Sequence, residues 1–331
     1  MRLVIASVSG RIIIVYPNDG FEPLTVLQTV EAEKCTALHG VPTMFIAELD
    51  HPDFDKFDLS SLRTGIMAGS SCPIEVMRRV IEKMHMQEVT IAYGMTETSP
   101  VSCQTNEHTP LEKQVSTVGL VQPALEVKVV DTGTGETLPI GETGELLTKG
   151  YSVMKGYWGS RFKTREAIQD GWMHTGDLAT MDEDGYVKVV GRSKDMVIRG
   201  GENIYPVEIE NYLYRHPKIG DVQVVGIPDE RYGEVLAAWI IPKEGVDLTE
   251  EEVKQFCYDN IAHYKIPAYY RFVTEYPMTI TGKIQKYKII EQMTAELGLA
   301  LIYISIDLYK SFIIQNTAKY LMTPYFCKNV L

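Results

Sequence analysis

The sequence lacks three features that would each have defined a class of protein. Of its 331 residues, 32 are Lys or Arg and 44 are Asp or Glu, so the formal net charge is −12. The excess of cationic side chains that binding to a nucleic-acid backbone requires is missing, which argues against a general nucleic-acid-binding protein. The apolar runs Leu3–Tyr16 and Leu297–Ile306 are too short to span a membrane.

Cysteine is scarce and irregularly placed. The five cysteines include no CxxC pair, so the sequence predicts neither a disulfide scaffold nor a cysteine zinc site. A reducing compartment is the natural one for such a chain, and we do not expect secretion. The cysteines are Cys35, Cys72, Cys103, Cys257 and Cys327.

The chain does contain enough apolar material for a substantial core. Hydrophobic residues make up 45% of it and charged residues 23%, which argues against disorder, and the length predicts roughly two domains. The β-branched run between Arg11 and Tyr16 predicts a buried strand. Arg2 and Arg11, with no acid before Asp19, give only a faint likeness to a transit peptide.

Residues 11–115 alternate short apolar runs with helical patterns, which predicts an α/β fold with a parallel, doubly wound sheet. The runs RIIIVYP and CTALHGVP indicate strands, whereas Leu24–Ala32 and Pro73–Met84 indicate helices. In the second helix apolar residues recur at helical spacing, and Pro73 suits its first turn.

From about residue 116 the pattern changes to closely spaced hairpins such as GELLTKG and DLATMDEDGYVKVVG, which predict a small β-barrel or sandwich. After the polar connector GRSKDMVIRGGEN the chain becomes α+β: Pro206 opens a helix, VQVVGIP indicates a strand, and Thr249 with Glu252 forms a capping box. We therefore predict a large domain over 1–192, with its β-barrel part at about 116–192, and a small domain over 193–297. The tail 298–331 shows no recognisable pattern.

Two polar loops follow predicted strands. In AGSSCP, residues 68–73, free backbone N–H groups of a first helical turn can meet a ligand, although a tight turn has the same sequence. In IAYGMTETSP, Tyr93 can stack on a flat base, Thr96 can donate to a phosphate oxygen and Glu97 can hold Mg²⁺. The alternative is a polar loop that merely caps the next helix.

Two further segments place charged side chains where a ligand can meet them. Pairing across the turn DEDG brings Asp177 and Arg192 to the same open end of a hairpin, where they can grip vicinal hydroxyls and a phosphate or form a surface salt bridge. In PMTITGKIQKYK, Lys283, Lys286 and Lys288 occur without an acid. These lysines either attract an anion or protect a strand edge from pairing with another chain.

The order and spacing of these segments indicate a protein family more strongly than any one segment does. AGSS, YGMTET, HTGD, GRSKDMVIRGGENIYPVEIE and TITGKIQK together resemble the adenylate-forming superfamily of acyl-CoA synthetases, firefly-type luciferases and peptide-synthetase adenylation domains. The residues of the last two segments are most similar to those of medium-chain fatty acyl-CoA ligases, including mitochondrial acyl-CoA synthetases. The resemblance runs from about Gly10 to Leu297.

The resemblance implies ATP-dependent joining of a carboxylic acid to AMP, followed by displacement of AMP by the thiol of coenzyme A. It assigns Lys283 as the cation that bridges carboxylate and phosphate, Thr96 as a phosphate contact, and Glu97 as the Mg²⁺ ligand. Among the nucleotide-binding residues, the adenine contacts lie in the polar segments AGSSCP and IAYGMTETSP and the ribose contacts in the DEDG hairpin. The implied nucleotide-binding residues are Gly69, Ser70, Tyr93, Gly94, Asp177 and Arg192.

By the same resemblance Lys194 lies at a hinge. A rotation there would withdraw Lys283 and bring Gly200 and Gly201 to the site, where glycine lets the pantetheine arm of coenzyme A pass close to the backbone. The resemblance implies only small-molecule substrates, namely fatty acid, ATP and coenzyme A, with no nucleic acid and no membrane span. It also implies the mitochondrial matrix in a eukaryote or the cytoplasm in a bacterium.

One part of the family pattern is missing. The glycine-, serine- and threonine-rich phosphate loop should lie upstream, yet between Met1 and Asp50 the only glycines are Gly10, Gly20 and Gly40. We therefore expect an N-terminally truncated ligase whose own activity is impaired. A non-catalytic ligand-binding or interaction protein is the alternative from a different class.

Overall fold

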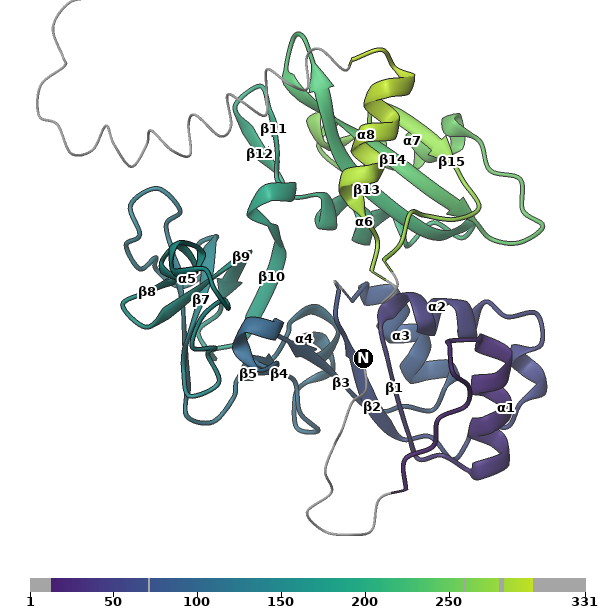
Figure 1. Ribbon diagram of the computed structural model, residues 1–331. Coiled ribbons are helices and arrows are strands. Elements are labelled where there is room, and N and C mark those ends of the chain that lie inside the picture. Colours follow the sequence, from purple (N-terminus) through teal and green to yellow (C-terminus); the bar gives the residue numbers. More distant parts are fainter. Residues whose placement is uncertain (1–12, 71, 259, 280–282, 300–331) are drawn as a thin grey trace, which may run out of the picture.

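The computed structural model describes residues 13–70, 72–258, 260–279 and 283–299 (Figure 1). Three sheets follow one another along the chain, and each has its own place in the molecule. The sheet β1–β5 and its helices form the lower part of Figure 1, the sheet β6–β10 stands beside it, and β11–β15 lie above. This is the α/β arrangement followed by an α+β region that the sequence predicts.

The first sheet is parallel where the predicted strand and helix patterns alternate. Its strand order is β1-β2-β3-β4-β5. Strands β1, β2 and β3 are parallel, β4 is antiparallel to β3, and β5 is antiparallel to β4. Gly65 lies where β2 passes β1, and a Cβ there would meet the Leu38 carbonyl oxygen at 1.9 Å. The strands are β1 (Ala37–Gly40), β2 (Thr64–Ala68), β3 (Glu88–Tyr93), β4 (Cys103–Gln104) and β5 (Leu120–Val121).

Helices build the core against this sheet. In α3 the buried residues Val76, Met77, Val80 and Ile81 recur at i, i+1, i+4 and i+5, so one face of the helix enters the core, as its sequence predicts. Two predicted helices, at Leu24–Ala32 and Pro73–Met84, are thus confirmed as α1 and α3. The helices of this region are α1 (Pro23–Glu33), α2 (Pro42–Leu49), α3 (Ile74–Lys83) and α4 (Leu111–Ser116), with 3₁₀ turns η1 (Phe54–Lys56) and η2 (Thr96–Thr98).

The buried strand predicted at the β-branched run near the start is wrong for its described part. Residues 13–17 form no strand, and the Ile13 side chain is 88% exposed. A β-branched run is buried only where a neighbouring strand pairs with it, and β1 pairs with β2 alone. Residues 11 and 12 lie outside the described part of the chain.

The second sheet is antiparallel, as its hairpin-rich sequence predicts. Its strand order is β10-β9-β7-β6, and β8 pairs with β9. Leu146, Ala179 and Val187 form its core together with Cys103 of β4, which ties the second sheet to the first. The elements are β6 (Leu125–Val130), β7 (Gly144–Gly150), α5 (Arg161–Ala167), β8 (Ile168–Gln169), β9 (Trp172–Met181) and β10 (Val187–Arg192).

The third sheet separates two small cores. Along β13 the side chains alternate: Val222 and Val224 face the core beneath α6 and α7, whereas Val225 and Ile227 face the core beneath α8. Its order is β12-β11-β14-β13, with β15 parallel to β14. The elements are η3 (Ser193–Asp195), β11 (Val197–Arg199), β12 (Glu202–Ile204), α6 (Pro206–Leu213), β13 (Ile219–Asp229), β14 (Gly233–Pro242), α7 (Glu250–Tyr258), η4 (His263–Lys265), β15 (Tyr269–Phe272) and α8 (Lys286–Glu296).

Local signals in this region are confirmed. Pro206 is the first residue of α6, and Thr249 and Glu252 form the predicted capping box at the start of α7: the Thr249 N–H donates to the Glu252 carboxylate at 3.0 Å, and the Glu252 N–H donates to Thr249 Oγ1 at 3.3 Å. Within the described ranges, no helix combines the length and apolar character that a bilayer crossing requires.

The third region rests on the first. The backbone N–H of Ile74, at the start of α3, donates to Oδ1 of Asn211 in α6 at 3.4 Å, and Tyr214 packs against the first core. Figure 1 shows α6 directly above the end of the first sheet where α2 and α3 begin. The chain passes from the second to the third sheet through η3, which follows β10 directly.

Candidate functional site

Tyr93 and Asp177 form the centre of the site. Tyr93 ends β3, and its hydroxyl donates a hydrogen bond of 2.6 Å to Oδ2 of Asp177 on β9. This contact joins the first sheet to the second at the edge where parallel strands end, the usual place for a ligand in such sheets. Burial and the neighbouring Asp177 carboxylate raise the pKa of Tyr93, so its hydroxyl keeps its proton and acts as a donor.

Asp177 and Arg192 lie opposite each other, as the sequence predicts from pairing across the DEDG turn. They are register partners in the β9–β10 hairpin, and Arg192 Nε lies 3.5 Å from Asp177 Oδ1. The Asp177 side chain is 17% exposed and that of Arg192 is 69% exposed. Burial raises the pKa of Asp177, whereas the Tyr93 hydrogen bond and the Arg192 charge oppose that rise.

The stretch of β9 that carries Asp177 is fixed by a residue that the sequence reasoning missed. One carboxylate oxygen of Glu145, on β7, lies 2.9 Å from Nδ1 of His174, and the other accepts the Gly176 N–H at 3.0 Å. Thr175 Oγ1 donates to the Leu146 carbonyl at 2.6 Å. Glu145 therefore holds both sides of the segment HTGD. The only signal for Glu145 in the sequence was its place in the segment GEL, on a strand that pairs with β9.

The loop after β3 holds the predicted phosphate and metal contacts. Thr96 is exposed in η2, and Glu97 follows it. The Tyr157 hydroxyl donates to Glu97 Oε1 at 2.9 Å, and the Met154 N–H donates to the Glu97 carbonyl at 2.8 Å. The segment after β7 thus fixes both ends of Glu97. The sequence reasoning missed this role of Tyr157, because the two residues are 60 positions apart.

Glycines shape the edge next to Tyr93. A Cβ on Gly94 would meet the Pro100 carbonyl oxygen at 1.8 Å, so no side chain fits there. Gly69 follows β2 with φ +96°, a value that favours glycine. Because Ala68 and Ala92 are register partners in the parallel pair β2–β3, Gly69 and Ser70 leave the sheet at the same edge as Tyr93. Four of the predicted nucleotide-binding residues thus share one edge.

The first turn of α3 is not wholly free. The sequence predicts unpaired N–H groups there, but the N–H of Ile74 is taken by Asn211 of α6. Contact between the regions, rather than a ligand, satisfies this donor. Ser71 lies outside the described residues, so the predicted loop 68–73 is described only in part.

Lys283 lies next to residues that the structure does not describe, 280–282. Its N–H donates to Thr279 Oγ1 at 3.0 Å, and its carbonyl accepts the Thr279 N–H at 2.8 Å. Figure 1 shows the chain on both sides of this turn running from the third region toward the first. Lys283 is exposed.

Lys286 does not belong to an exposed basic cluster with Lys283. Its ammonium group donates to Glu210 Oε1 at 2.6 Å and to the Val224 carbonyl at 3.2 Å. The Glu210 side chain is only 9% exposed, so this is an internal ion pair at the start of α8. Sequence proximity to Lys283 misleads here, because α8 begins at Lys286 and turns its side chain inward.

The predicted hinge and coenzyme A residues lie on the third region. Lys194 is exposed in η3. Gly200 and Gly201 form the turn of the β11–β12 hairpin with φ of +59° and +92°. In Figure 1 this hairpin points away from the first sheet, so this arrangement does not bring the two glycines to Tyr93.

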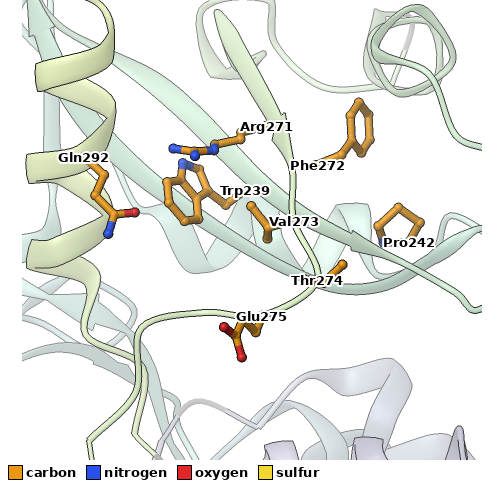
Figure 2. Close-up of a pocket in the computed structure, with 8 residues that line it drawn as sticks. All are labelled: Trp239, Pro242, Arg271, Phe272, Val273, Thr274, Glu275 and Gln292. Carbon is orange, nitrogen blue, oxygen red and sulfur yellow. The ribbon is translucent and has the colours of Figure 1, made fainter.

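A separate hollow of about 510 Å³ opens on the third region between β14, β15 and α8. Figure 2 shows the Arg271 guanidinium over the Trp239 indole, with Gln292 facing them from α8. The guanidinium lies 4.5 Å from the ring centroid and also pairs with Glu296 at 2.5 Å. None of the predicted site residues lines this hollow.

A metal cage made only of protein groups is not present in the described residues, where no three His, Cys, Asp or Glu side chains gather. This does not conflict with a site for Mg²⁺, which commonly uses one or two carboxylates together with substrate phosphates. Glu97 supplies such a carboxylate beside the exposed Thr96 hydroxyl. The residues present therefore fit a magnesium ion bound jointly with a nucleotide.

Comparison with known proteins agrees with the resemblance in the sequence. A model of the AMP-binding enzyme family matches residues 1–158, and one of the AMP-binding enzyme C-terminal domain matches 208–283. The chain is 59% identical to the putative acyl-CoA synthetase YngI of Bacillus subtilis, covering 83% of this chain and 50% of that protein. It is 51% identical to the mitochondrial medium-chain acyl-CoA ligase ACSF2 of Danio rerio, covering 86% and 47%.

Among solved structures, the anthranilate CoA ligase AuaEII in complex with anthranoyl-AMP is 32% identical, with a TM-score of 0.79 over 86% of this chain and 55% of that one. The chain spans about half the length of the curated relatives it matches. Both family models, the two relatives and the solved structure indicate the same family. The chain therefore belongs to the family of AMP-binding enzymes.

Proposed function

We propose that this chain carries the acyl-adenylate site of an ATP-dependent fatty acid–coenzyme A ligase. The observation that supports this most is the line of Tyr93, Asp177 and Arg192, which joins a flat ring, a half-buried carboxylate and an exposed guanidinium. An adenosine monophosphate offers groups of matching chemistry in the same order: a flat base, vicinal hydroxyls and a phosphate.

Each of these residues has a definite task in the proposal. The ionised Asp177 carboxylate accepts hydrogen bonds from the ribose hydroxyls, and Arg192 contributes positive charge beside them. Tyr93, Gly94, Gly69 and Ser70 form the edge that holds the adenine. Glu145 acts on Asp177 indirectly, since it fixes the stretch of β9 that presents the carboxylate.

The loop after β3 serves the phosphate. Thr96 donates to a phosphate oxygen, and Glu97, held by Tyr157, is the carboxylate for Mg²⁺. Bound Mg²⁺ neutralises the charge that develops on the phosphate oxygens. Lys283 brings a further cation from the small domain, and its exposure leaves the ammonium group free to approach an anion.

The proposed reaction has two steps. A carboxylate oxygen of the fatty acid bonds to the α-phosphorus of ATP, the bond from that phosphorus to the β-phosphate oxygen breaks, and pyrophosphate leaves. The sulfur of coenzyme A then bonds to the acyl carbon, the bond from that carbon to the AMP oxygen breaks, and the thiol proton passes to solvent. Rotation at Lys194 exchanges Lys283 for Gly200 and Gly201 between the steps.

The names of the relatives support a medium-chain fatty acid as substrate and either the mitochondrion or a bacterial cytoplasm as location. The segment 39–45, which joins β1 to α2, is our candidate for one wall of the acyl pocket. A ligand-binding protein without catalysis is the second candidate, because Tyr93, Asp177 and Arg192 can hold an adenosine monophosphate whether or not a reaction follows.

The two candidates separate in a pair of assays on the full chain. The first supplies octanoate, ATP, Mg²⁺ and coenzyme A and measures AMP. The second supplies octanoyl-AMP and coenzyme A and measures octanoyl-CoA, a step that needs no β- or γ-phosphate. Isothermal titration with AMP measures binding without catalysis, and Lys283→Ala controls for contaminating enzyme in the first assay.

A ligase produces AMP in the first assay and loses this activity with Lys283→Ala. Octanoyl-CoA formation in the second assay alone means that the chain keeps the thioester step but not adenylation. AMP binding with no product in either assay favours the ligand-binding protein. The proposal fails if AMP does not bind, or if Asp177→Asn binds AMP as tightly as the unmodified chain.

A further inference from the structure

The second sheet presents an exposed aromatic surface on the segment between β7 and β8. We define residues 151–165 as the α5 surface. The Trp158 side chain is fully exposed at 103%, Tyr151 is 78% exposed and Phe162 is 72% exposed. Several large aromatic side chains left in water on one short folded segment indicate an interaction site. None of them is assigned a role in the site described above.

The backbone holds these rings outward. The Ser160 N–H donates to the Tyr157 carbonyl at 3.2 Å, which closes a turn around Trp158. The Tyr157 N–H donates to Thr164 Oγ1 at 2.9 Å, so this turn is fastened to α5. None of the seven residues of α5 is buried. Trp158 and Phe162 are therefore displayed by an ordered turn and helix.

The charge of this surface is opposite to that of the chain. Residues 151–165 contain four Lys or Arg residues and no Asp or Glu, although the whole chain has a net charge of −12. Arg161, Lys163 and Arg165 alternate with Phe162 and Thr164 on α5 itself. Aromatic rings flanked by Lys and Arg match the boundary between the anionic headgroups and the acyl chains of a membrane.

The α5 surface also adjoins the site. Tyr157 lies immediately before Trp158, and its hydroxyl reaches Glu97 in the loop after β3. Figure 1 shows α5 and β8 on the outer side of the second sheet, away from α1 and from the third region. A flat partner can therefore reach this face without meeting the other two regions.

We propose that the α5 surface docks on a lipid bilayer that carries anionic headgroups. Trp158 and Phe162 enter the boundary between headgroups and acyl chains, and Arg161, Lys163 and Arg165 contact the headgroup phosphates. Exposed aromatic rings together with Lys and Arg match an occupant that is both apolar and anionic, which selects a bilayer over the acidic surface of a second copy. If the ligase function holds, docking places the site beside the membrane that dissolves its fatty acid.

The test uses the full chain and vesicles of two compositions, phosphatidylcholine alone and phosphatidylcholine with 30% phosphatidylglycerol. Sedimentation measures the bound fraction. We expect binding to the anionic vesicles that falls as salt rises, since each cation near such a surface strengthens binding about fivefold. The variant Trp158→Ala with Phe162→Ala should weaken binding at least tenfold, and Lys163→Glu with Arg165→Glu should abolish it.

Tyr258→Ala is the matched control, because this ring is 62% exposed but lies on the small domain; it should bind as the unmodified chain does. Since the changed side chains are all exposed, circular dichroism should show an unchanged fold. The proposal is overturned if anionic vesicles do not bind, or if the Trp158 and Phe162 variant binds unchanged. It is also overturned if light scattering shows a dimer that this variant disrupts, which assigns the surface to a second copy. AMP binding, measured separately, tests the ligase proposal and is not affected by either result.

Discussion

The hydroxyl of Tyr93 lies 2.6 Å from Oδ2 of Asp177, and this hydrogen bond links residues 84 positions apart in the sequence. It brings the end of the parallel sheet to the open end of the antiparallel β9–β10 hairpin. Burial raises the pKa of Asp177, while the hydrogen bond from Tyr93 and the charge of Arg192 lower it. Two neighbours thus favour the ionised carboxylate and oppose the effect of burial, which is the larger of the two influences on its pKa.

The variant Tyr93→Phe removes this donor and keeps the ring. The pKa of Asp177 should rise further, so a larger fraction of the carboxyl is protonated at low pH and cannot accept from ribose. We expect AMP binding to weaken about tenfold, as for loss of a hydrogen bond to a charged group. Titration calorimetry should find a larger loss at pH 5 than at pH 8. An equal loss at both values would exclude a role through Asp177, and Tyr151→Phe serves as the control.

Glu145 is the second residue whose removal should weaken AMP binding without touching the nucleotide. The variant Glu145→Ala frees the Gly176 N–H and the His174 ring, so the stretch of β9 before Asp177 loses its support. We expect affinity for AMP to fall roughly fivefold to thirtyfold, in line with one or two lost hydrogen bonds. Glu126→Ala, an exposed glutamate on the adjacent strand β6, should leave affinity unchanged. An unaltered affinity in Glu145→Ala would contradict the positioning role.

Much of this site could be predicted from local patterns. The DEDG turn with flanking alternation predicts which residues pair across β9 and β10, and Asp177 and Arg192 are indeed partners. Likewise, the polar loop after β3 lies at a strand end that the alternation of apolar runs reveals. These predictions hold because pairing register and helix periodicity are set by neighbouring residues.

The supporting contacts could not be predicted in this way. Glu145 and Tyr157 reach the site from other strands and loops, and their contacts depend on how the first and second sheets meet. Residues 13–16 have a strand-like composition but no partner strand. In each case long-range packing decides the outcome, and a single sequence contains no direct signal for it.

Lys286 tests whether the role of a residue follows from its contacts in the structure or from its proximity to Lys283 in the sequence. The variant Lys286→Met leaves Glu210 buried without its cation, which should lower the free energy of unfolding by about 3 kcal/mol. Denaturation in urea measures this loss. Lys288→Met, two residues further along α8, should cost less than about 1 kcal/mol because Lys288 forms no ion pair within the described chain. Equal stability of the two variants would contradict the structural role of Lys286.

Glu48 should make stability depend on pH. Its side chain in α2 is 3% exposed, its Oε2 has no hydrogen-bond partner among the described residues, and burial raises its pKa from 4.5 to about 8. Because the folded state prefers the protonated carboxyl, its contribution to stability is complete below about pH 4.5 and is lost as pH rises through about 8. At about 1.4 kcal/mol per pKa unit, the difference is at most about 5 kcal/mol.

The variant Glu48→Gln replaces the carboxyl with a neutral group of the same shape, so this contribution should no longer vary with pH. Urea denaturation between pH 5 and pH 9 should show that the stability of the variant relative to the unmodified chain increases with pH. Glu82→Gln, on the exposed face of α3, changes the same charge in water and should show no such increase. If both variants gave the same slope, the carboxyl of Glu48 would be ionised and solvated in the folded protein, which would contradict the prediction drawn from its burial.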